Sequence, residues 1–446
     1  MDPAVSPITS EKTWFGHPRG VSTLFFTEMW ERFSYYGMRA FLILYMVAPV
    51  NRGGLGMTDS QAGSIYGLYT GSVWMATIGG GLVADWILGA YRSVLLGSVL
   101  ITLGHLTLTV SSMPFFYSGL ALIVLGTGLL KPNVTTMVGS LYAPNDSRRD
   151  AGFSIFYMGI NIGAMLGPLI AGYLAQRVSW HIGFGCAAVG MTLGLVQYIY
   201  GRKYLKSGMD RLDHSLAAEK KTAAATTARG LHFSAAEWKR LAAIVVFFVF
   251  ASIFWGAYEQ AGSTLNLFAD RFTRLSVFGF SFPSSWFQSV PAFFVITLAP
   301  LFAWLWVRLG SKEPSSPMKF TFGLLFVGIA FLLLVPASTS AETGIRVSPM
   351  WLVGVYFLEV VGELCLSPVG LSLVTKLSPR KVVGMMMGVW FLAISVGSLI
   401  AGYLAGFMES YPLPKLFGSV GFVAIGASIV LLILLKPIKK LMGGVH

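Results

Sequence analysis

Long apolar runs alternate with short polar segments along most of this 446-residue chain. The runs are of helix length and rich in Leu, Ile, Val, Phe and Gly, and they lack the alternating pattern that an outer-membrane barrel needs. We count twelve runs, with approximate centres at Phe33, Met75, Leu103, Gly126, Gly163, Gly190, Phe254, Phe294, Val327, Gly362, Ala393 and Ile425. The pattern predicts an all-α integral membrane protein with twelve transmembrane helices.

The longest polar interruption lies in the middle of the chain, from about Lys203 to Trp238, and separates six predicted spans from six. We expect an N-terminal six-helix bundle over residues 1–203, a charged cytoplasmic linker over residues 204–238, and a C-terminal six-helix bundle over residues 239–446. This plan resembles that of the major facilitator superfamily, whose two halves rock about a site near the membrane midplane.

The segment between the second and third spans resembles a loop motif of the same superfamily. It reads Gly79-Gly80-Gly81-Leu82-Val83-Ala84-Asp85, followed by Gly89 and Arg92, with Trp86 where a basic residue is usual. The resemblance implies that Asp85 lies at a helix end and gates the interface between the two halves.

Composition and charge placement support the membrane assignment. Hydrophobic residues make up 55% of the chain and charged residues only 11%, against roughly 25% charged in an average soluble domain. One set of loops holds 23 of the 32 basic residues, the opposite loops hold 6, and 3 lie inside spans. Because cytoplasmic loops retain positive charge, both termini are predicted to be cytoplasmic. We expect the protein to lie in the cell (inner) membrane. The net charge of +13 then follows from topology and does not argue for nucleic acid.

Eight ionisable residues fall well inside predicted spans. A charge facing lipid at the bilayer centre costs roughly 2.5 to 3.5 kcal/mol, so these groups are expected to face a protein interior or a wet cavity. Acids outnumber bases by two, and an unpaired buried carboxylate lowers its cost by taking up a proton. The surplus makes the chain a candidate proton carrier. The eight are the acids Glu28, Glu31, Glu259, Glu359 and Glu363 and the bases Arg32, Arg39 and Lys131.

Helical spacing places several of these groups together. One face of the first span carries Glu28, Glu31, Arg32, Tyr35, Tyr36 and Arg39. Aromatic side chains along one helix face more often pack against other helices than bind a ligand. Here Arg32 and Arg39 flank Tyr35 and Tyr36, so the two tyrosine hydroxyls are expected to line the same hydrated face. Arg32 and Arg39 lie about 10 Å apart along the helix axis, so one can stay in an internal ion pair while the other meets a ligand.

Other candidates come from the fourth and later spans. Lys131 sits mid-span before Pro132, and a buried salt bridge with Glu28 or Glu31 is expected. Bases in the first half and Glu363 with Glu259 in the second form a slot suited to a zwitterion. For Glu359, sharing the face of Glu363 and snorkelling to the membrane surface are equally open.

Two further residue types are expected to be structural. His105, alone on an apolar span, is expected to be a hydrogen-bonded structural residue rather than a proton relay. Cys186 and Cys365 fall inside spans, where a small apolar role is expected, and no metal site is expected.

Five blocks in order resemble the proton-dependent oligopeptide transporter family of the major facilitator superfamily. They run from Glu28 to Gly370 and thus cover most of the chain. The blocks are Glu28-x-x-Glu31-Arg32-Phe33 running into Tyr35-Tyr36-Gly37, Gly128-Leu129-Leu130-Lys131-Pro132-Asn133, Phe156-Tyr157-Met158-Gly159-Ile160-Asn161-Ile162-Gly163, Phe254-Trp255-Gly256-Ala257-Tyr258-Glu259-Gln260, and Gly362-Glu363-Leu364-Cys365-Leu366-Ser367-Pro368-Val369-Gly370.

The resemblance implies proton-coupled uptake of di- and tripeptides by alternating access, with the proton as coupling ion and no other cofactor. Arg39 and Lys131 would hold the peptide carboxylate and Glu363 the amino group, and protonating Glu259 would release Arg32. The implied proton-coupling residues are Glu28, Glu31, Arg32 and Glu259. The implied substrate-binding residues are Tyr35, Tyr36, Arg39, Lys131, Tyr157, Asn161, Trp255, Glu363, Ser367 and Trp390.

Three departures from the family pattern concern substrate preference. Val290-Pro291 stands where Asn-Pro is common, Trp74 stands where a Tyr is usual, and the linker is too short for two extra helices found in many bacterial members. Alternatives are a transporter of nitrate or another small anion on the same fold, and a transceptor that binds peptide without moving it. An enzyme is least expected, since no nucleophile with a paired base stands out. The expected partners are peptides and the lipid bilayer, with a functional monomer.

Overall fold

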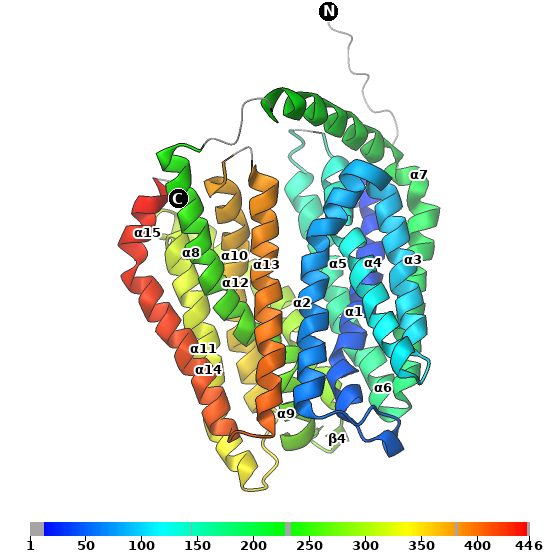
Figure 1. Ribbon diagram of the computed structural model, residues 1–446, viewed down its shortest axis with the longest axis vertical. Coiled ribbons are helices and arrows are strands. Elements are labelled where there is room, and N and C mark those ends of the chain that lie inside the picture. The colour runs from blue at the N-terminus through cyan, green and yellow to red at the C-terminus, as the bar shows by residue number, and fades with distance from the viewer. Residues whose placement is uncertain (1–12, 144, 228–232, 380–381, 444–446) are drawn as a thin grey trace, which may run out of the picture.

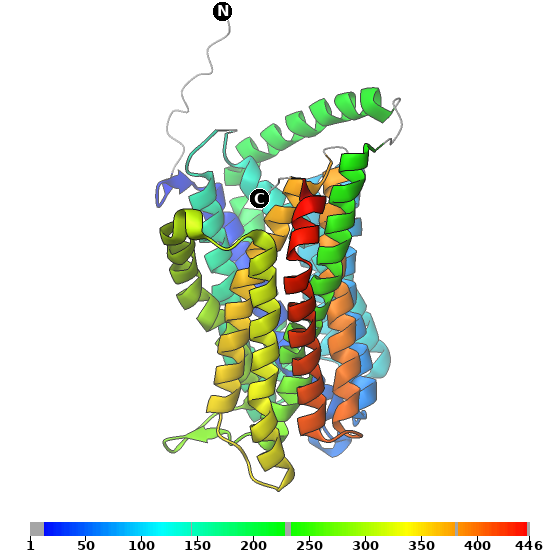
Figure 2. The ribbon, with the colours of Figure 1, turned by 90° about the vertical axis from the view of Figure 1, so that its left-hand side faces the viewer.

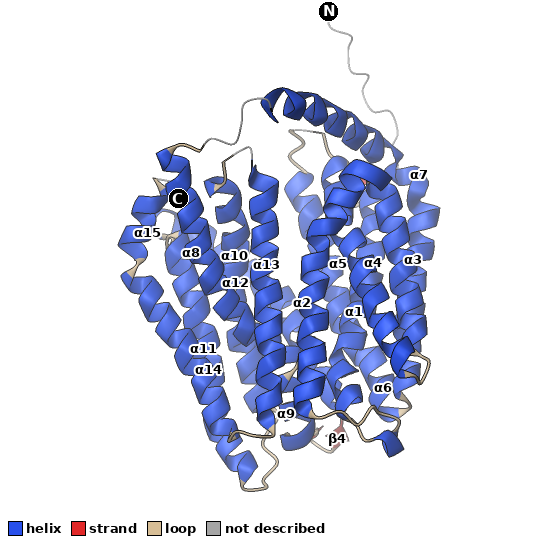
Figure 3. Cartoon of the chain, in the orientation of Figure 1, coloured by secondary structure: helices blue, strands red, loops and turns tan. Residues whose placement is uncertain are grey.

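The computed structural model describes residues 13–143, 145–227, 233–379 and 382–443. Helices dominate the described chain, and the strands are confined to two short antiparallel hairpins (Figure 3). The hairpins pair β1 (Thr13–Trp14) with β2 (His17–Pro18) and β3 (Ser276–Val277) with β4 (Phe280–Ser281). The extreme termini, predicted to be cytoplasmic, lie outside the described residues.

The helices form two sets along the chain. The first set is α1 (Gly20–Val47), α2 (Asp59–Val83), α3 (Ala90–Leu108), α4 (Met113–Ser140), α5 (Arg149–Gly167), α6 (Tyr173–Arg177) and α7 (Trp180–Thr227). The second set is α8 (Ala235–Tyr258), α9 (Thr264–Phe272), α10 (Val290–Leu309), α11 (Ser316–Glu342), α12 (Met350–Leu377), α13 (Val383–Ala405), α14 (Leu413–Ile433) and α15 (Leu435–Met442). Short 3-10 or π-helical turns extend or join them: η1 (Val50–Arg52), η2 (Ala84–Leu88), η3 (Pro168–Gly172), η4 (Glu259–Gly262), η5 (Ser284–Ser289), η6 (Gly310–Lys312) and η8 (Gly406–Met408).

The predicted spans are helices in the structure. Within the described residues, eleven helices, counted with their short extensions, are long and apolar enough to cross a membrane. Each contains one of the predicted centres after the first. The first centre, Phe33, lies in α1, which has 28 residues but carries four charged side chains and therefore falls outside that apolar set. The prediction of an all-α membrane protein is confirmed.

The two sets of helices stand side by side as two bundles (Figure 1). Within the first bundle α1 packs against α5 and α7, and α3 against α4. Within the second, α11 packs against α12 and α14. The bundles meet where α2 packs against α13 and α5 against α10. These four helices therefore form the sides of the interface between the two halves.

Local sequence sets where two of these helices begin. Thr58 before α2 accepts a hydrogen bond from Gln61 N, and the Gln61 side chain accepts one from Thr58 N. Ser234 and Glu237 form the same reciprocal pair at the start of α8. These capping boxes satisfy backbone N–H groups that a helix leaves unpaired at its first turn, so α8 starts cleanly after the linker.

The predicted linker is largely helical. The 48-residue α7 continues from the sixth span to Thr227 without a break in its helical assignment. Its C-terminal part crosses the end of the molecule opposite to α9 (Figures 1 and 2). The segment predicted over residues 204–238 is thus mainly an extension of the sixth span rather than an irregular connection.

Small residues bring α2 and α13 into close backbone contact. A Cβ atom added at Gly402 on α13 would overlap the carbonyl oxygen of Gly63 and the Cα atom of Gly67 on α2. Further along the same helix pair, Ser395 Oγ donates a hydrogen bond to Gly71 O at 2.8 Å. Close approach through small residues is typical of helix pairs in membranes, and here it joins the two halves.

Polar contacts join the halves at the end that contains α9. Arg271 on α9 donates two hydrogen bonds to the Asp59 carboxylate, at 2.5 and 2.6 Å. Gln176 on α6 donates to Asp270 Oδ1 at 3.2 Å and to Ser284 Oγ at 2.8 Å. The halves are therefore tied together on this side, away from the linker.

One structural expectation is wrong. His105 is fully buried on α3, but neither ring nitrogen has a hydrogen-bond partner among the described residues. The reason lies in the same helix face, because the residues one turn before and after it, Ile101 and Leu108, are buried and apolar. Cys186 and Cys365 are free cysteines inside helices, partly and fully buried.

We predict that Gly402→Ala weakens the α2–α13 contact. The added methyl group has no room, and overpacking of this kind costs about 1–3 kcal/mol, which should appear as a lower melting temperature of the protein in detergent. Gly426→Ala is the matched control, because a Cβ atom there meets nothing within 4 Å and alanine favours the helix. Equal melting temperatures for both variants would contradict the prediction.

Candidate functional site

A cavity of about 330 Å³ lies between the two halves. Its walls come from α1, α2, α4 and α5 on one side and from α8, η4, η5, α10, α12 and α13 on the other. The lining residues are Glu28, Arg32, Tyr36, Arg39, Trp74, Lys131, Tyr157, Ile160, Asn161, Ala164, Trp255, Tyr258, Glu259, Ala261, Gln288, Pro291, Ala292, Val295, Glu363, Ser367, Leu371, Trp390, Phe391 and Ile394.

The first part of the stripe on α1 forms a buried cluster of two carboxylates and one guanidinium. Arg32 Nε lies 3.2 Å from Glu28 Oε1 and also forms an ion pair with Glu31. Glu28 Oε2, Glu31 Oε1 and Arg32 Nη2 are buried without a hydrogen-bond partner among the described residues. Two acids share one base here, so the cluster has room for one more positive charge or one proton.

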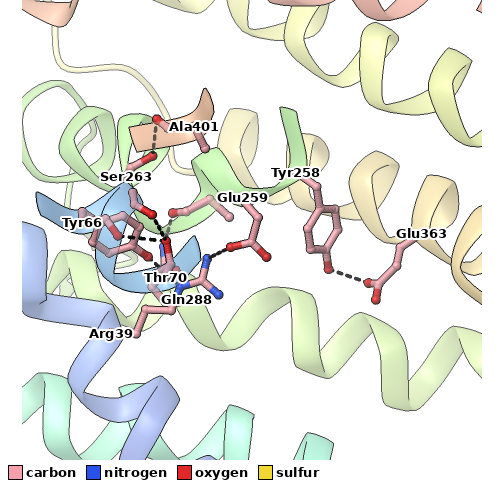
Figure 4. Close-up of polar contacts among 11 residues, drawn as sticks. Arg39, Tyr66, Thr70, Tyr258, Glu259, Ser263, Gln288, Glu363 and Ala401 are labelled. Carbon is pink, nitrogen blue, oxygen red and sulfur yellow. Dashed lines mark hydrogen bonds and ion pairs between the residues drawn. The ribbon is translucent and has the colours of Figure 1, made fainter. Parts of the chain in front are cut away.

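Arg39, two turns further along α1, reaches across to the other half. Its Nη2 lies 2.5 Å from Glu259 Oε2, and its Nε donates a hydrogen bond to the Tyr66 hydroxyl at 2.6 Å (Figure 4). The side chains of Arg39 and Glu259 are only 11% and 6% exposed. This is a buried ion pair that links the two bundles at the level of the cavity.

The sequence resemblance paired Glu259 with Arg32, and that pairing is wrong. Arg32 is already held by two acids of its own helix, which stand four residues and one residue before it. Arg39 lies nearer to η4, where Glu259 stands just after the end of α8. Helical spacing identified both arginines but not which of them meets the opposite half.

The backbone of η4 is shaped to admit this ion pair. At Gly262 an added Cβ atom would overlap the Tyr66 hydroxyl and lie 2.9 Å from Arg39 Nε. The change from α8 to the tighter η4 also lies deep in the molecule, where Glu259 and Gln260 are buried. Irregular backbone at membrane depth is tolerated where it is buried in protein or lines a cavity. Both conditions hold for η4, which is buried and contributes Glu259 to the cavity wall.

Glu363 on α12 lines the cavity from the second half. The Tyr258 hydroxyl donates a hydrogen bond to Glu363 Oε2 at 2.5 Å (Figure 4). Tyr258 is the last residue of α8, so it and Glu259 are neighbours that face two different charged partners. Sequence reasoning missed Tyr258, although it stands inside the block that contains Glu259.

Lys131 does not form the salt bridge expected from sequence. Its Nζ lies 3.5 Å from the ring centroid of Trp74, and no ion pair to it occurs among the described residues. A cation–π contact with Trp74 therefore stands in place of the expected ion pair. Trp74 in turn stacks on Phe391 of α13, with ring centroids 5.9 Å apart, so this departure from the family pattern contacts both halves.

Most other predicted substrate-binding residues line the cavity. They are Tyr36, Tyr157, Asn161, Trp255, Ser367 and Trp390. Two predicted residues stand behind its wall: Glu31 is fully buried in its ion pair, and Tyr35 is 3% exposed, with its ring 5.3 Å from Arg32 Cζ. Gln288 and Phe391 line the cavity without having been predicted.

Two further candidates lie away from the cavity wall. Asp85 is exposed in η2, between α2 and α3. Glu359 on α12 is fully buried, so the alternative in which it snorkels to the membrane surface is wrong. Within the described residues, no group of three or more His, Cys, Asp or Glu side chains could hold a metal ion.

Comparisons with known proteins agree with this geometry. A family model described as "POT family" matches residues 91–226 and 209–418. The transporter YclF of Bacillus subtilis (strain 168), described as uncharacterized, is 42% identical and covers 98% of this chain and 97% of its own length. The peptide transporter YePEPT of Yersinia enterocolitica is 38% identical over 97% of this chain and 96% of its own, and a di-/tripeptide transporter of Lactococcus lactis subsp. cremoris is 37% identical over 98% and 99%.

Solved structures match along nearly the whole chain. A crystal structure of a peptide transporter POT in complex with sulfate superposes with a TM-score of 0.89 at 40% identity, covering 97% of this chain and 98% of the other. A POT family transporter in complex with a thioalcohol conjugated peptide superposes with a TM-score of 0.87 at 33% identity, covering 96% and 99%.

We predict that removing either partner of the ion pair between the halves is worse than removing both. Arg39→Met or Glu259→Met leaves an unpaired buried charge and should lower the free energy of unfolding by about 3–5 kcal/mol, whereas the double variant should regain most of it. Melting temperatures of the purified protein measure this. Arg148→Met is a control, because Arg148 is 51% exposed in its ion pair with Asp146, and a pair near the surface is worth about 0–1 kcal/mol. A double variant as unstable as the two single losses added together would refute the prediction.

Proposed function

The chain belongs to the POT family, and on that premise we propose that it is a proton-coupled symporter that imports di- and tripeptides by alternating access. It is a multi-pass membrane protein with the fold of the major facilitator superfamily, and it transports peptides. The relatives reported above are named as transporters, which supports a carrier rather than an enzyme.

The placement of charges around the cavity is the observation that carries this proposal. Arg39 and Lys131 line it from the first half, and Glu363 lines it from the second. A short peptide is a zwitterion with a carboxylate at one end and an ammonium at the other. Its two ends are complementary to the two walls, and the cavity volume lies at the small end of ligand sites, which run from about 300 to 1,000 Å³.

Tyr157 and Asn161 would contact the peptide backbone, while Trp255 and Trp390 would contact its side chains. A small anion such as nitrate has no ammonium for Glu363, and that carboxylate would repel it. The structure therefore supports peptide over anion transport.

We place the coupling between proton and peptide at the ion pair of Arg39 with Glu259. A proton on Glu259 removes its negative charge, and Arg39 then becomes available to the peptide carboxylate. The same step breaks one tie between the bundles, which biases the balance between two arrangements of the halves. The proton is the coupling ion in this scheme, and no cofactor takes part.

The cluster of Glu28, Glu31 and Arg32 supplies a second place for a proton. Its two carboxylates exceed its one guanidinium, so a proton taken up there leaves the cluster neutral. Asp85, at the junction of α2 and α3, would act on the opening of the linker-side end.

We further propose an inner-membrane location with both termini in the cytoplasm. The excess of Lys and Arg lies in the loops on the side of the linker, and cytoplasmic loops retain such charge. The end tied by Asp59 and Arg271 then faces away from the cytoplasm. The protein would work as a monomer in the bilayer, since the cavity is formed within one chain.

The direct test is uptake of labelled dialanine into liposomes that contain the purified protein and carry an imposed inward proton gradient. Uptake should collapse when a protonophore removes the gradient, and unlabelled dipeptides but not nitrate should compete with it. Gradient-independent uptake would refute the coupling. Saturable binding without flux would instead identify a transceptor.

We predict that Glu28→Gln or Glu31→Gln reduces gradient-driven uptake to below about a tenth of the parent rate, because each removes a proton site. Counterflow, which needs no net proton movement, should survive in at least one of the two variants. Asp210→Asn, at an exposed position of α7, is the control with unchanged uptake. Driven uptake at the parent rate in both glutamine variants would exclude this cluster from coupling.

We predict that Glu363→Gln removes the preference for a free amino group. Loss of one partner of a buried charge pair should weaken dialanine binding by roughly 30-fold, about 2 kcal/mol. N-acetyl-dialanine, which lacks the ammonium, should bind the parent and the variant equally. Competition binding with both compounds measures this, and an equal loss for both would place Glu363 outside the amino-end site.

A further inference from the structure

Glu359 on α12 is the buried acid that the scheme above does not use. Its side chain is fully buried, and neither carboxylate oxygen has a hydrogen-bond partner among the described residues. It lies one helical turn before Glu363, on the same face of α12. Unlike Glu363, it does not line the cavity.

The other buried acids of the described chain are all paired. Glu28 and Glu31 pair with Arg32, Asp59 pairs with Arg271, and Glu259 pairs with Arg39. An ionised carboxylate buried without a partner is costly, and such a group avoids the cost by holding a proton. Glu359 is therefore a place where this conformation stores a proton.

Among the residues that the structure describes, none near Glu359 supplies a cation that could replace the proton. The groups that act on it electrostatically are Glu363 and Tyr356 on its own helix, and Tyr258 and Glu259 from α8 and η4. The helices α10 and α11, which pack against α12, carry charged residues only near their ends, namely Arg308, Lys319 and Glu342. The described part of α13 carries no charged residue and one tyrosine, Tyr403.

Glu363 gives Glu359 a route to the cavity. It lines the cavity, accepts the hydrogen bond of Tyr258, and stands one turn away on the same helix face. A proton can pass from cavity water to the Glu363 carboxylate and from there to Glu359. The first transfer breaks an O–H bond of a hydronium ion and forms the O–H bond of Glu363. The second breaks that bond and forms the O–H bond of Glu359, so that no other reactant is needed.

We propose that Glu359 is a second proton-carrying site of the transporter, located in the C-terminal half and loaded through Glu363. When the peptide ammonium arrives, the proton rests on Glu359 and Glu363 is left ionised to hold the ammonium. After the peptide leaves toward the cytoplasm, the proton returns through Glu363 to water. This inference rests on the proposed function, because it assigns one proton of the symport to a residue that never touches the peptide.

The number of protons moved with each peptide tests the proposal. In liposomes held at zero membrane potential, each coupled proton multiplies the limiting accumulation of a neutral dipeptide by about ten per unit of pH difference. With one pH unit imposed, Glu359→Gln should accumulate labelled dialanine about tenfold less than the parent. Its counterflow rate and its affinity for dialanine should stay within about twofold of the parent, since glutamine resembles the protonated acid.

A second neutral variant guards against a folding defect. Glu359→Met has a similar size and no polar group, which suits a site without hydrogen-bond partners, so it should melt at or above the parent temperature. It should show the same tenfold loss of accumulation. Asp210→Asn serves as the control acid and should accumulate dialanine as the parent does.

The outcomes separate the alternatives. Accumulation at the parent level in Glu359→Gln and Glu359→Met would overturn the proposal and leave Glu359 a structural residue. Loss of counterflow in a variant that melts at the parent temperature would also overturn it, because a proton store is not needed for exchange. If the parent itself shows no gradient-dependent accumulation, the result refutes the proposed symport, and this failure is distinguishable from a failure of the proton site at Glu359.

Discussion

The ion pair between Arg39 and Glu259 is the contact on which the arrangement of the site depends. It joins the two bundles inside a region where each charge alone would be costly. To make room for it, α8 ends at Tyr258, η4 follows, and Gly262 leaves space for the Tyr66 hydroxyl that holds the other edge of the guanidinium. The backbone of η4 thus provides the space that the ion pair between Arg39 and Glu259 needs.

The same pair explains why the halves can both adhere and separate. In this conformation the bundles are held on the side of α9 by the glycine contact of α2 with α13 and by the two hydrogen bonds between Asp59 and Arg271. At the cavity they are held by an acid and a base. A charge pair can be switched by a proton or by a competing carboxylate, whereas packed glycines carry no charge on which either could act. A switchable tie therefore lies beside the ligand site, as alternating access requires.

Sequence patterns together with the family resemblance identified the spans and half of the residues that line the cavity, but not the partners of the charges. Helical period identifies a face within one span, which is why the stripe on α1 could be recognised. Which base meets Glu259 depends on how the two bundles pack against each other. Arg39 and Glu259 are 220 residues apart in sequence, and no helical period encodes a contact over that separation. The same limit explains why Lys131 was given a carboxylate and lies on Trp74 instead, and why Tyr258 was missed.

Charge counting connects the sequence with the mechanism. The spans hold five acids and three bases, and the structure distributes this surplus between the halves. On α1, Glu28 and Glu31 share one guanidinium; Arg39 and Glu259 cancel; Lys131 and Glu363 face the cavity as unlike charges that suit the two ends of a zwitterion. What remains is one excess carboxyl in the cluster on α1 and one, Glu359, in the second half. Because a buried excess carboxyl favours a proton, each half contains one site that can gain or lose charge while the other charged groups stay balanced.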